Sequence, residues 1–276
     1  MATERVALVL GGGGMKGLAH VGVWRALREA RVRVTEITGT SIGALVGACV
    51  AGGLDVETLT ASARALQKPE IVTLNRWALL FNGIRQQSVF RGDVFQAYIE
   101  SILPVPEFEE LWLPLAVNAV DIGTGEVVWF GRGGRSDVAL GEAVYASCAL
   151  PVFYPPALID GHYYMDGGVL DPLPVLHALA QGADRVIAVD VSAGPLADAG
   201  QIVEKGLVAI HHRTMQIMGN RRKAELLAAL DSERVMYIRP DLGAYSTFDF
   251  ENTEYFLEEG YRATAEALGL PDRAAG

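Results

Sequence analysis

The chain has 276 residues, 50% of them hydrophobic, and 33 acidic against 23 basic residues give it a net charge of −10. This length and apolar content can bury a large core, and no proline- or serine-rich linker divides the chain, so we predict one domain over residues 1–276. The acidic charge disfavours nucleic-acid binding, which depends on neutralising phosphates, and also strong, purely electrostatic adsorption to anionic membranes.

The first fifty residues alternate between strands and helices. A continuous apolar run predicts a buried strand over residues 5–10, and apolar residues at helical spacing predict a helix over 17–30. A short strand over 32–38 and a helix of small residues over 41–51 follow. This β-α-β-α order predicts an α/β fold with a parallel sheet and right-handed crossovers.

The alternation continues less regularly through the rest of the chain. Apolar spacing predicts helices over residues 55–66, 92–103, 138–148, 172–181, 200–230 and 252–268, and strands over 115–120, 126–130, 185–191 and 235–239. Residues 121–125 are expected to form a hairpin-like turn, and the prolines within 150–156 predict an extended loop. Basic residues within 211–213 and 220–223 favour a solvated helix face, with a local basic patch as the alternative.

Residues 68–91 are irregular and rich in apolar side chains. The apolar residues are Ile71, Leu74, Trp77, Leu79, Leu80, Phe81 and Ile84. One interpretation is a lid or lipid contact, and the other is the ordinary core of a helical subdomain.

A glycine loop directly follows the first strand. From Gly11 to Gly17 four glycines, a methionine and a lysine precede a fifth glycine, so the loop offers backbone N–H groups that no side chain covers. Such donors can stabilise the oxyanion of a tetrahedral intermediate. The spacing of Gly12, Gly14 and Gly17 also matches the dinucleotide-binding fingerprint, with Glu36 near its acidic position. Glu36 precedes the end of the second strand, which disfavours that alternative.

A second glycine-framed turn contains a serine. Ser41 lies between Gly39 and Gly43, after the second strand and before the second helix. A tight strand-to-helix turn leaves no room for side chains at the two glycines. A serine nucleophile needs a nearby base, and a helix N-terminus favours negative charge that develops there. The alternative is that Ser41 merely caps the helix.

The candidate bases are an aspartate turn and a histidine. Gly167 and Gly168 follow Asp166, leave its carboxylate unshielded and let the chain turn sharply, although a plain β-turn would look the same. His162 is the weaker candidate, because none of the five histidines sits in a motif typical of a triad histidine. His20 lies inside the first predicted helix and is expected to be structural.

The two cysteines and the apolar segments bear on location. Cys49 and Cys148 lie among small apolar residues, belong to no disulfide framework or metal-ligand cluster, and are expected to be buried thiols of a reducing compartment. The N-terminus lacks the pattern of a signal peptide, and the longest apolar stretch, residues 42–54, is shorter than the roughly 20 residues of a membrane span. We therefore expect a cytoplasmic protein.

The three turns and their order resemble the patatin-like phospholipases, in particular their small soluble bacterial members. The family's G-G-G-x-[KR]-G loop corresponds to residues 12–17, its G-x-S-x-G motif to residues 39–43 and its D-G-[GA] motif to residues 166–168. Three ordered motifs at compatible spacing make the resemblance specific.

The resemblance extends over roughly residues 5–270. Residues 113–126 look like the family's central hairpin, 146–151 like its A-S-x-A-x-P segment and 182–191 like the strand after its aspartate. One departure is Val152, where relatives often carry glycine.

This resemblance implies a three-layer α/β fold with a mainly parallel central sheet and helices on both faces. The catalytic motifs would lie in residues 5–195, and residues 200–276 would complete the domain. A Ser–Asp dyad is implied, in which Ser41 attacks an ester carbonyl while Asp166 acts as base and then as acid. The backbone N–H groups of the oxyanion hole would come from Gly13, Gly14 and Met15. The supporting motif residues are Gly12, Lys16, Gly17, Gly39, Gly43, Gly167 and Gly168.

The implied activity is that of a serine acyl hydrolase of lipid esters, of phospholipase A, lysophospholipase or esterase type. Its partner would be a lipid or acyl-ester substrate, reached through a transient membrane-surface contact, and no metal or organic cofactor is implied. Two alternatives stay open. One is an acyltransferase with the same acyl-enzyme, and the other is a catalytically silent lipid-binding regulator, which the intact Ser41 and Asp166 disfavour.

Overall fold

The computed structural model describes residues 4–75, 85–192, 198–230, 233–243 and 245–271. The strands are β1 (Val6–Leu10), β2 (Glu36–Gly39), β3 (Leu115–Asp121), β4 (Val127–Gly131), β5 (Ala157–Ile159), β6 (His162–Asp166), β7 (Arg185–Val189) and β8 (Val235–Ile238). The α-helices are α1 (Ala19–Glu29), α2 (Ile42–Ala51), α3 (Val56–Ala65), α4 (Lys68–Ile71), α6 (Gly92–Ile102), α7 (Leu140–Cys148), α8 (Val175–Ala180), α9 (Ala199–Glu204), α10 (Leu207–Ala229) and α11 (Thr253–Ala267). Short 3₁₀-helices are η1 (Gly14–Leu18), η3 (Phe108–Glu110) and η4 (Gly167–Val169). Of the candidate lid residues, Trp77, Leu79, Leu80, Phe81 and Ile84 lie outside the described residues.

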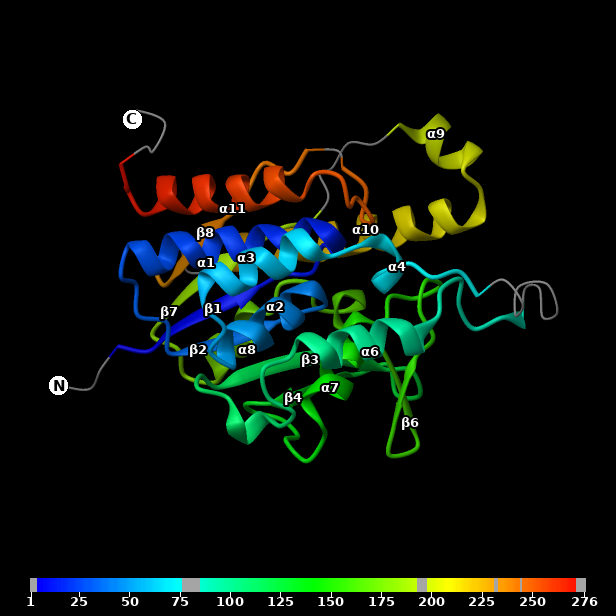
Figure 1. The fold of residues 1–276 in the computed structure, drawn as a ribbon, viewed down its shortest axis with the longest axis horizontal. Helices are drawn as coiled ribbons and strands as arrows, with labels where there is room; N and C mark the ends of the chain where they lie inside the picture. Colours follow the sequence, from blue (N-terminus) through cyan, green and yellow to red (C-terminus); the bar gives the residue numbers. More distant parts are fainter. Residues whose placement is uncertain (1–3, 76–84, 193–197, 231–232, 244, 272–276) are drawn as a thin grey trace.

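In the described part of the chain, the strands form one sheet in the order β5-β6-β3-β2-β1-β7-β8, and β4 pairs with the other edge of β3 (Figure 1). Strands β3, β2, β1, β7 and β8 run parallel to one another. Strands β4 and β6 run antiparallel to β3, and β5 runs antiparallel to β6. The predicted α/β fold with a mainly parallel sheet is confirmed.

Side chains on β1 alternate between two cores. Leu8 and Leu10 face a large core that helices α1, α2 and α11 share, whereas Ala7 and Val9 face a smaller core against α8 and the end of α10. Burial on both faces explains why β1 is a continuous apolar run in the sequence. Helices therefore cover both faces of the sheet, as expected.

The hairpin of β5 and β6 was not predicted from the sequence. Strand β5 has three residues, and β6 exposes Tyr163 to 52%, so neither gives the apolar run of a buried strand. The predicted helix over 172–181 begins only at Val175, because the residue before Pro174 is held out of the helical conformation.

The loop predicted to be extended over residues 150–156 begins instead with a tight turn. The backbone N–H groups of Phe153 and Tyr154 both donate to the carbonyl oxygen of Leu150. Val152 has a φ of 73°, a left-handed conformation that costs a β-branched side chain roughly 1–3 kcal/mol and suits glycine. This conformation explains why a glycine would fit at this position.

Strands β2 and β6 approach each other head-on along one edge of β3. Gly39 at the end of β2 lies opposite Val117, and Asp166 at the end of β6 lies opposite Ala119. Because β2 is parallel and β6 antiparallel to β3, their carboxyl ends meet near the middle of that strand. Whatever follows β2 is therefore placed beside the end of β6.

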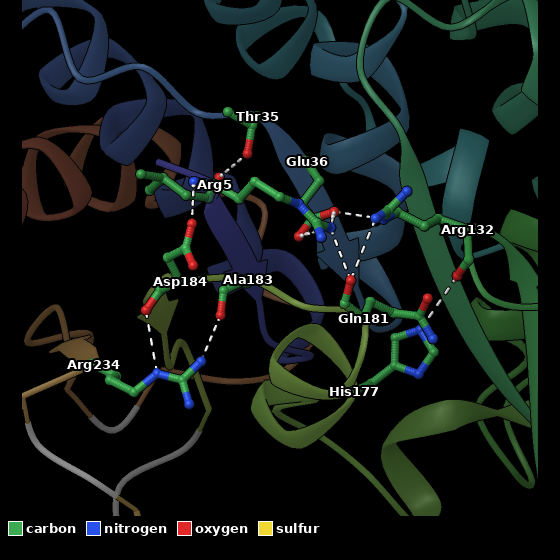
Figure 2. A network of polar contacts seen from close by, with 10 residues as sticks. Arg5, Thr35, Glu36, Arg132, His177, Gln181, Ala183, Asp184 and Arg234 are labelled. Carbon is green, nitrogen blue, oxygen red and sulfur yellow. Dashed lines mark hydrogen bonds and ion pairs between the residues drawn. The ribbon is translucent and has the colours of Figure 1, made fainter. Parts of the chain in front are cut away.

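Two partly exposed arginines around the buried Glu36 fix the amino end of β2 (Figure 2). Glu36 is 3% exposed, and its carboxylate accepts hydrogen bonds of 3.2 and 2.9 Å from Nη2 of Arg5 and lies 2.5 Å from Nε of Arg132. Both guanidinium groups also donate to the carbonyl oxygen of Gln181. Glu36 pairs in register with Ala7, so it lies at the end of the sheet away from the glycine loop, which argues against a ribose-binding role.

These ion pairs make Glu36→Gln a test of how β2 is held. The substitution removes the negative charge between two guanidinium groups while keeping the side-chain shape, so the free energy of unfolding should fall by roughly 2 kcal/mol. Urea denaturation measures the change. Glu258→Gln is the matched control, because Glu258 pairs with Arg25 while 62% exposed, and its loss should be much smaller. Equal losses in the two variants would contradict the interpretation.

Candidate active site

Ser41 occupies a strained turn between β2 and α2. Its φ is 56°, and its side chain makes no capping hydrogen bond to the helix, so the capping alternative is wrong. A Cβ atom at Gly39 would lie 2.6 Å from Cα of Ala44, and one at Gly43 would lie 2.1 Å from the carbonyl oxygen of Leu10. These approaches confirm that the turn excludes side chains at both glycines.

Asp166 lies directly beside Ser41. The hydroxyl of Ser41 donates to Oδ2 of Asp166 at 2.7 Å, and Oδ1 accepts the backbone N–H of Gly168 at 2.7 Å. Asp166 is 3% exposed, and this burial raises the pKa of its carboxyl to about 6, although the two hydrogen bonds lower it in part. One carboxylate oxygen is thus held by the backbone while the other faces the serine.

Hydrogen bonds from neighbouring segments fasten the two turns together. The backbone N–H of Ser41 donates to Oγ of the buried Ser147 at 2.9 Å. The Thr40 hydroxyl and the Asn118 amide both donate to the carbonyl oxygen of Asp171, at 3.1 and 2.9 Å. Helix α7, strand β3 and the segment after β6 therefore all position the Ser41 turn.

Histidines are not partners of this pair. His162 lies at the far end of β6, where Nδ1 is 3.0 Å from Oδ2 of Asp121 and the side chain is 59% exposed. His20 is buried in α1 with Nε2 2.8 Å from the carbonyl oxygen of Gly11. In the described part of the chain, no histidine side chain hydrogen-bonds to Ser41 or Asp166.

The glycine loop presents two backbone donors beside this pair. The N–H groups of Gly13 and Gly14 have no hydrogen-bond partner among the described residues. Gly12 donates to the carbonyl oxygen of Pro172 at 3.1 Å. The prediction for Met15 is corrected: its N–H donates to the carbonyl oxygen of Thr247 at 2.8 Å and is not available to an oxyanion.

The predicted site residues gather around one cavity of about 160 Å³. Those that line it are Gly12, Gly13, Gly14, Met15, Lys16, Ser41, Asp166 and Gly168. Gly17, Gly39, Gly43 and Gly167 do not line it and act through the packing of the turns. Its apolar wall includes Ile71, Phe95, Leu150, Tyr154 and Phe248.

Two buried lysines line the polar side of the cavity. Lys16 is 1% exposed, burial lowers its pKa to about 8, and its Nζ lies 3.4 Å from the carbonyl oxygen of Tyr245. Lys223 pairs with the carboxylate of Asp190 at 2.8 and 2.9 Å and also contacts Oγ of Ser192. Asp190 compensates the charge of Lys223, whereas Lys16 has no ion-pair partner among the described residues.

Sequence reasoning missed the contribution of α10 to this cavity. His212, Gln216, Asn220 and Lys223 all line it, and burial lowers the pKa of His212 to about 4, so the imidazole is neutral at pH 7. The basic residues within 211–213 and 220–223 were the signal, and they were expected on a solvated helix face. That prediction is wrong for Lys223, which is 6% exposed, and for His212, which lines the cavity.

The described residues contain neither a membrane-spanning helix nor a metal-ligand cluster. None of the helices there is both long enough and apolar enough to span a bilayer. Groups of three or more histidine, cysteine, aspartate or glutamate side chains that could hold a metal ion are likewise absent from those residues.

Comparison with known proteins gives a consistent set of relatives. The family model for patatin-like phospholipase matches residues 8–179. An uncharacterized NTE family protein of Mycobacterium tuberculosis is 36% identical over 201 residues, which are 72% of this chain and 53% of that protein. Patatin-like phospholipase domain-containing protein 7 of Rattus norvegicus is 32% identical over 282 residues, which are 93% of this chain and 20% of that protein. The chain thus spans about half the length, or less, of these curated relatives.

Solved structures share the fold. VipD from Legionella pneumophila matches with a TM-score of 0.61 at 17% identity, covering 97% of this chain and 67% of that one. The type III effector ExoU matches with a TM-score of 0.51 at 16% identity, covering 96% of this chain and 53% of that one. The likeness shows that the arrangement of sheet and helices is shared.

The raised pKa of Asp166 predicts that its carboxylate weakens the fold at neutral pH. The pKa of Asp166 in the folded protein, about 6, lies above the ordinary carboxyl value of 3.8, so the folded state binds the proton more tightly than the unfolded state does. The contribution of Asp166 to stability therefore falls as pH rises from about 4 to 6. Asp166→Asn should therefore gain stability relative to the wild type between pH 4 and pH 8, by roughly 2–3 kcal/mol. Chemical denaturation at both pH values measures the difference.

Asp121→Asn supplies the control of opposite sign. Backbone N–H groups of Thr124 and Gly123 and the His162 ring lower the pKa of Asp121. The stability that Asp121 contributes in this way is lost as pH falls below about 4, so its substitution should become more destabilising as pH rises through that range and should change little between pH 4 and pH 8. A pH-independent difference between Asp166→Asn and the wild type would contradict the prediction.

Proposed function

The chain belongs to the patatin-like phospholipase family, and we propose that it is a serine acyl hydrolase of lipid esters in which Ser41 is the nucleophile and Asp166 the base. The observation that carries this proposal is the 2.7 Å hydrogen bond from the Ser41 hydroxyl to the Asp166 carboxylate at the wall of the cavity. An apolar wall suits an acyl chain, and the adjacent backbone donors suit an oxyanion.

The first half of the reaction forms an acyl-enzyme. Asp166 takes the proton from Oγ of Ser41 while Oγ bonds to the ester carbonyl carbon. The carbonyl oxygen becomes an oxyanion, which the N–H groups of Gly13 and Gly14 stabilise. The bond from carbon to the leaving oxygen then breaks, and Asp166 gives its proton to the departing alcohol.

The second half releases the fatty acid. Asp166, again ionised, takes a proton from water as the water oxygen bonds to the acyl carbon. The tetrahedral intermediate collapses, the bond to Oγ of Ser41 breaks, and the proton on Asp166 returns to the serine. If an alcohol replaced water as the acceptor, the same acyl-enzyme would transfer its acyl group and the protein would be an acyltransferase. Assays with added glycerol or lysolipid distinguish the two activities by whether acylated acceptor forms.

The environment of Asp166 suits a base without histidine. A carboxylate of ordinary pKa is a weak base for a hydroxyl, and burial strengthens it by raising its pKa toward the working pH. The backbone N–H of Gly168 holds the other oxygen and so orients the carboxylate toward Ser41.

Substitution of the pair tests the roles directly. Ser41→Ala and Asp166→Asn should each lower hydrolysis of a short-chain ester by at least about 1,000-fold, since the first lacks the nucleophile and the second cannot accept a proton. A fluorophosphonate probe should add one adduct to the wild type and none to Ser41→Ala, as seen by intact-mass spectrometry. His162→Ala is the control and should retain near wild-type activity. If His162→Ala lost as much ester hydrolysis as Ser41→Ala, the mechanism would need a histidine. If the fluorophosphonate probe added no adduct to the wild type, a lipid-binding regulator would be favoured.

The activity should depend on the ionisation of Asp166. Because the carboxylate form is the base, kcat/KM should rise with pH, reach half its maximum near pH 6 and level off above about pH 7. The profile is measured with a soluble ester, and circular dichroism at each pH confirms that the protein remains folded. A flat profile from pH 5 to pH 8 would remove Asp166 from the role of base.

A further inference from the structure

Helix α10 joins the core near its end but exposes several large apolar side chains in its first half. Near its end, Leu226 packs against the smaller core beneath the sheet. In its first half, Leu207, Ile210, Ile217 and Met218 are 78, 42, 54 and 52% exposed. Side chains of this size are normally buried, so the first half presents an apolar surface that the described part of the molecule does not cover.

The exposed side chains form one continuous stripe. At helical spacing Leu207, Ile210, Thr214, Ile217 and Met218 share one side of α10, and we call them the apolar stripe. Thr214 is its only polar member, and its hydroxyl donates to the carbonyl oxygen of Ile210 at 3.0 Å, so no polar group is left unsatisfied there. The stripe is about 16 Å long at the rise of an α-helix.

The opposite side of the same helix is a wall of the active-site cavity. His212, Met215, Gln216, Gly219 and Lys223 line that cavity and lie half a turn from the apolar stripe. The stripe and the cavity are therefore separated by one helix, about 10 Å across. Figure 1 shows α9 and the start of α10 projecting at the edge of the molecule, away from the sheet.

Positive charge accompanies the stripe in an otherwise acidic protein. Between Glu204 and Glu225 the sequence has no acidic residue, and four of the basic residues there, Lys205, Arg213, Arg221 and Arg222, lie outside the buried Lys223–Asp190 pair, while the whole chain has a net charge of −10. Lys205 and Arg222 are exposed beyond the two ends of the stripe. Arg221 is also exposed and pairs with Glu225, but both side chains are mostly in water, where such a pair is weak.

We propose that the apolar stripe docks on an anionic lipid surface. A lipid surface offers both an apolar layer for the stripe and negative charge for the flanking basic residues, which is the combination that interfacial helices use. Long basic side chains at the stripe ends reach the headgroups while their stems lie on apolar surface. Docking places the active-site cavity one helix away from the lipid. The proposal rests on the proposed function, because docking would bring a lipid hydrolase to its substrate, but binding to the lipid surface can be measured without catalysis.

Vesicle co-sedimentation of the Ser41→Ala protein tests docking without turnover. The protein should bind vesicles that mix phosphatidylglycerol with phosphatidylcholine and bind phosphatidylcholine alone more weakly. Leu207→Glu with Ile217→Glu should lower binding to the mixed vesicles at least about tenfold, because charge replaces the apolar contact. Leu176→Glu is the matched control on α8, 60% exposed, and should bind as the parent does. Equal binding by the parent and the double variant, or equal losses in the control, would overturn the proposal.

Two further measurements separate the outcomes. Hydrolysis of a water-soluble short-chain ester should be unchanged by the double substitution in the wild-type background, since neither side chain lines the cavity. A protein that binds vesicles but hydrolyses no ester would overturn the proposed function and leave docking supported. Light scattering after size exclusion reports the oligomeric state. If the parent protein is a dimer that binds no vesicles, and the double substitution converts it to a monomer, the stripe is an interface with a second copy of the chain. That outcome would overturn docking on lipid.

Discussion

The site depends on two strands that approach head-on along a single edge of β3. Ser41 and Asp166 are 125 residues apart in the chain, and they meet because β2 ends opposite Val117 and β6 ends opposite Ala119. A parallel sheet alone would place the serine turn at its carboxyl edge and leave nothing beside it. The antiparallel strand β6 fills that space and brings a carboxylate to hydrogen-bond distance.

Features that weaken the fold are concentrated at this meeting point. Ser41 is held at a positive φ, and Asp166 is buried with a raised pKa. A backbone conformation of this kind persists only where the surrounding structure holds it. Close packing at Gly39 and Gly43 and the hydrogen bond from the Ser41 N–H to Ser147 keep the geometry fixed. In the proposed mechanism the same burial supplies the basicity of the carboxylate.

Different parts of helix α10 face the core, the cavity and the surface of the molecule. Its last turns belong to the core under the sheet, one side of its middle belongs to the cavity, and the other side of its first half is apolar and exposed. The buried pair of Lys223 and Asp190 anchors the helix to the end of β7.

The sequence by itself determined the first β-α-β-α unit, the glycine-framed serine turn and the alternation of later strands and helices. These follow from local rules, since burial on both faces makes a strand continuously apolar and a tight turn admits only glycine at fixed spacing. Only the tertiary structure decided that a short, partly exposed hairpin carries Asp166. It also decided that the N–H of Met15 donates to the carbonyl oxygen of Thr247, and that α10 forms one wall of the cavity. Each of these joins segments far apart in the chain, and no local pattern of residues records which distant backbone group or side chain will be its partner.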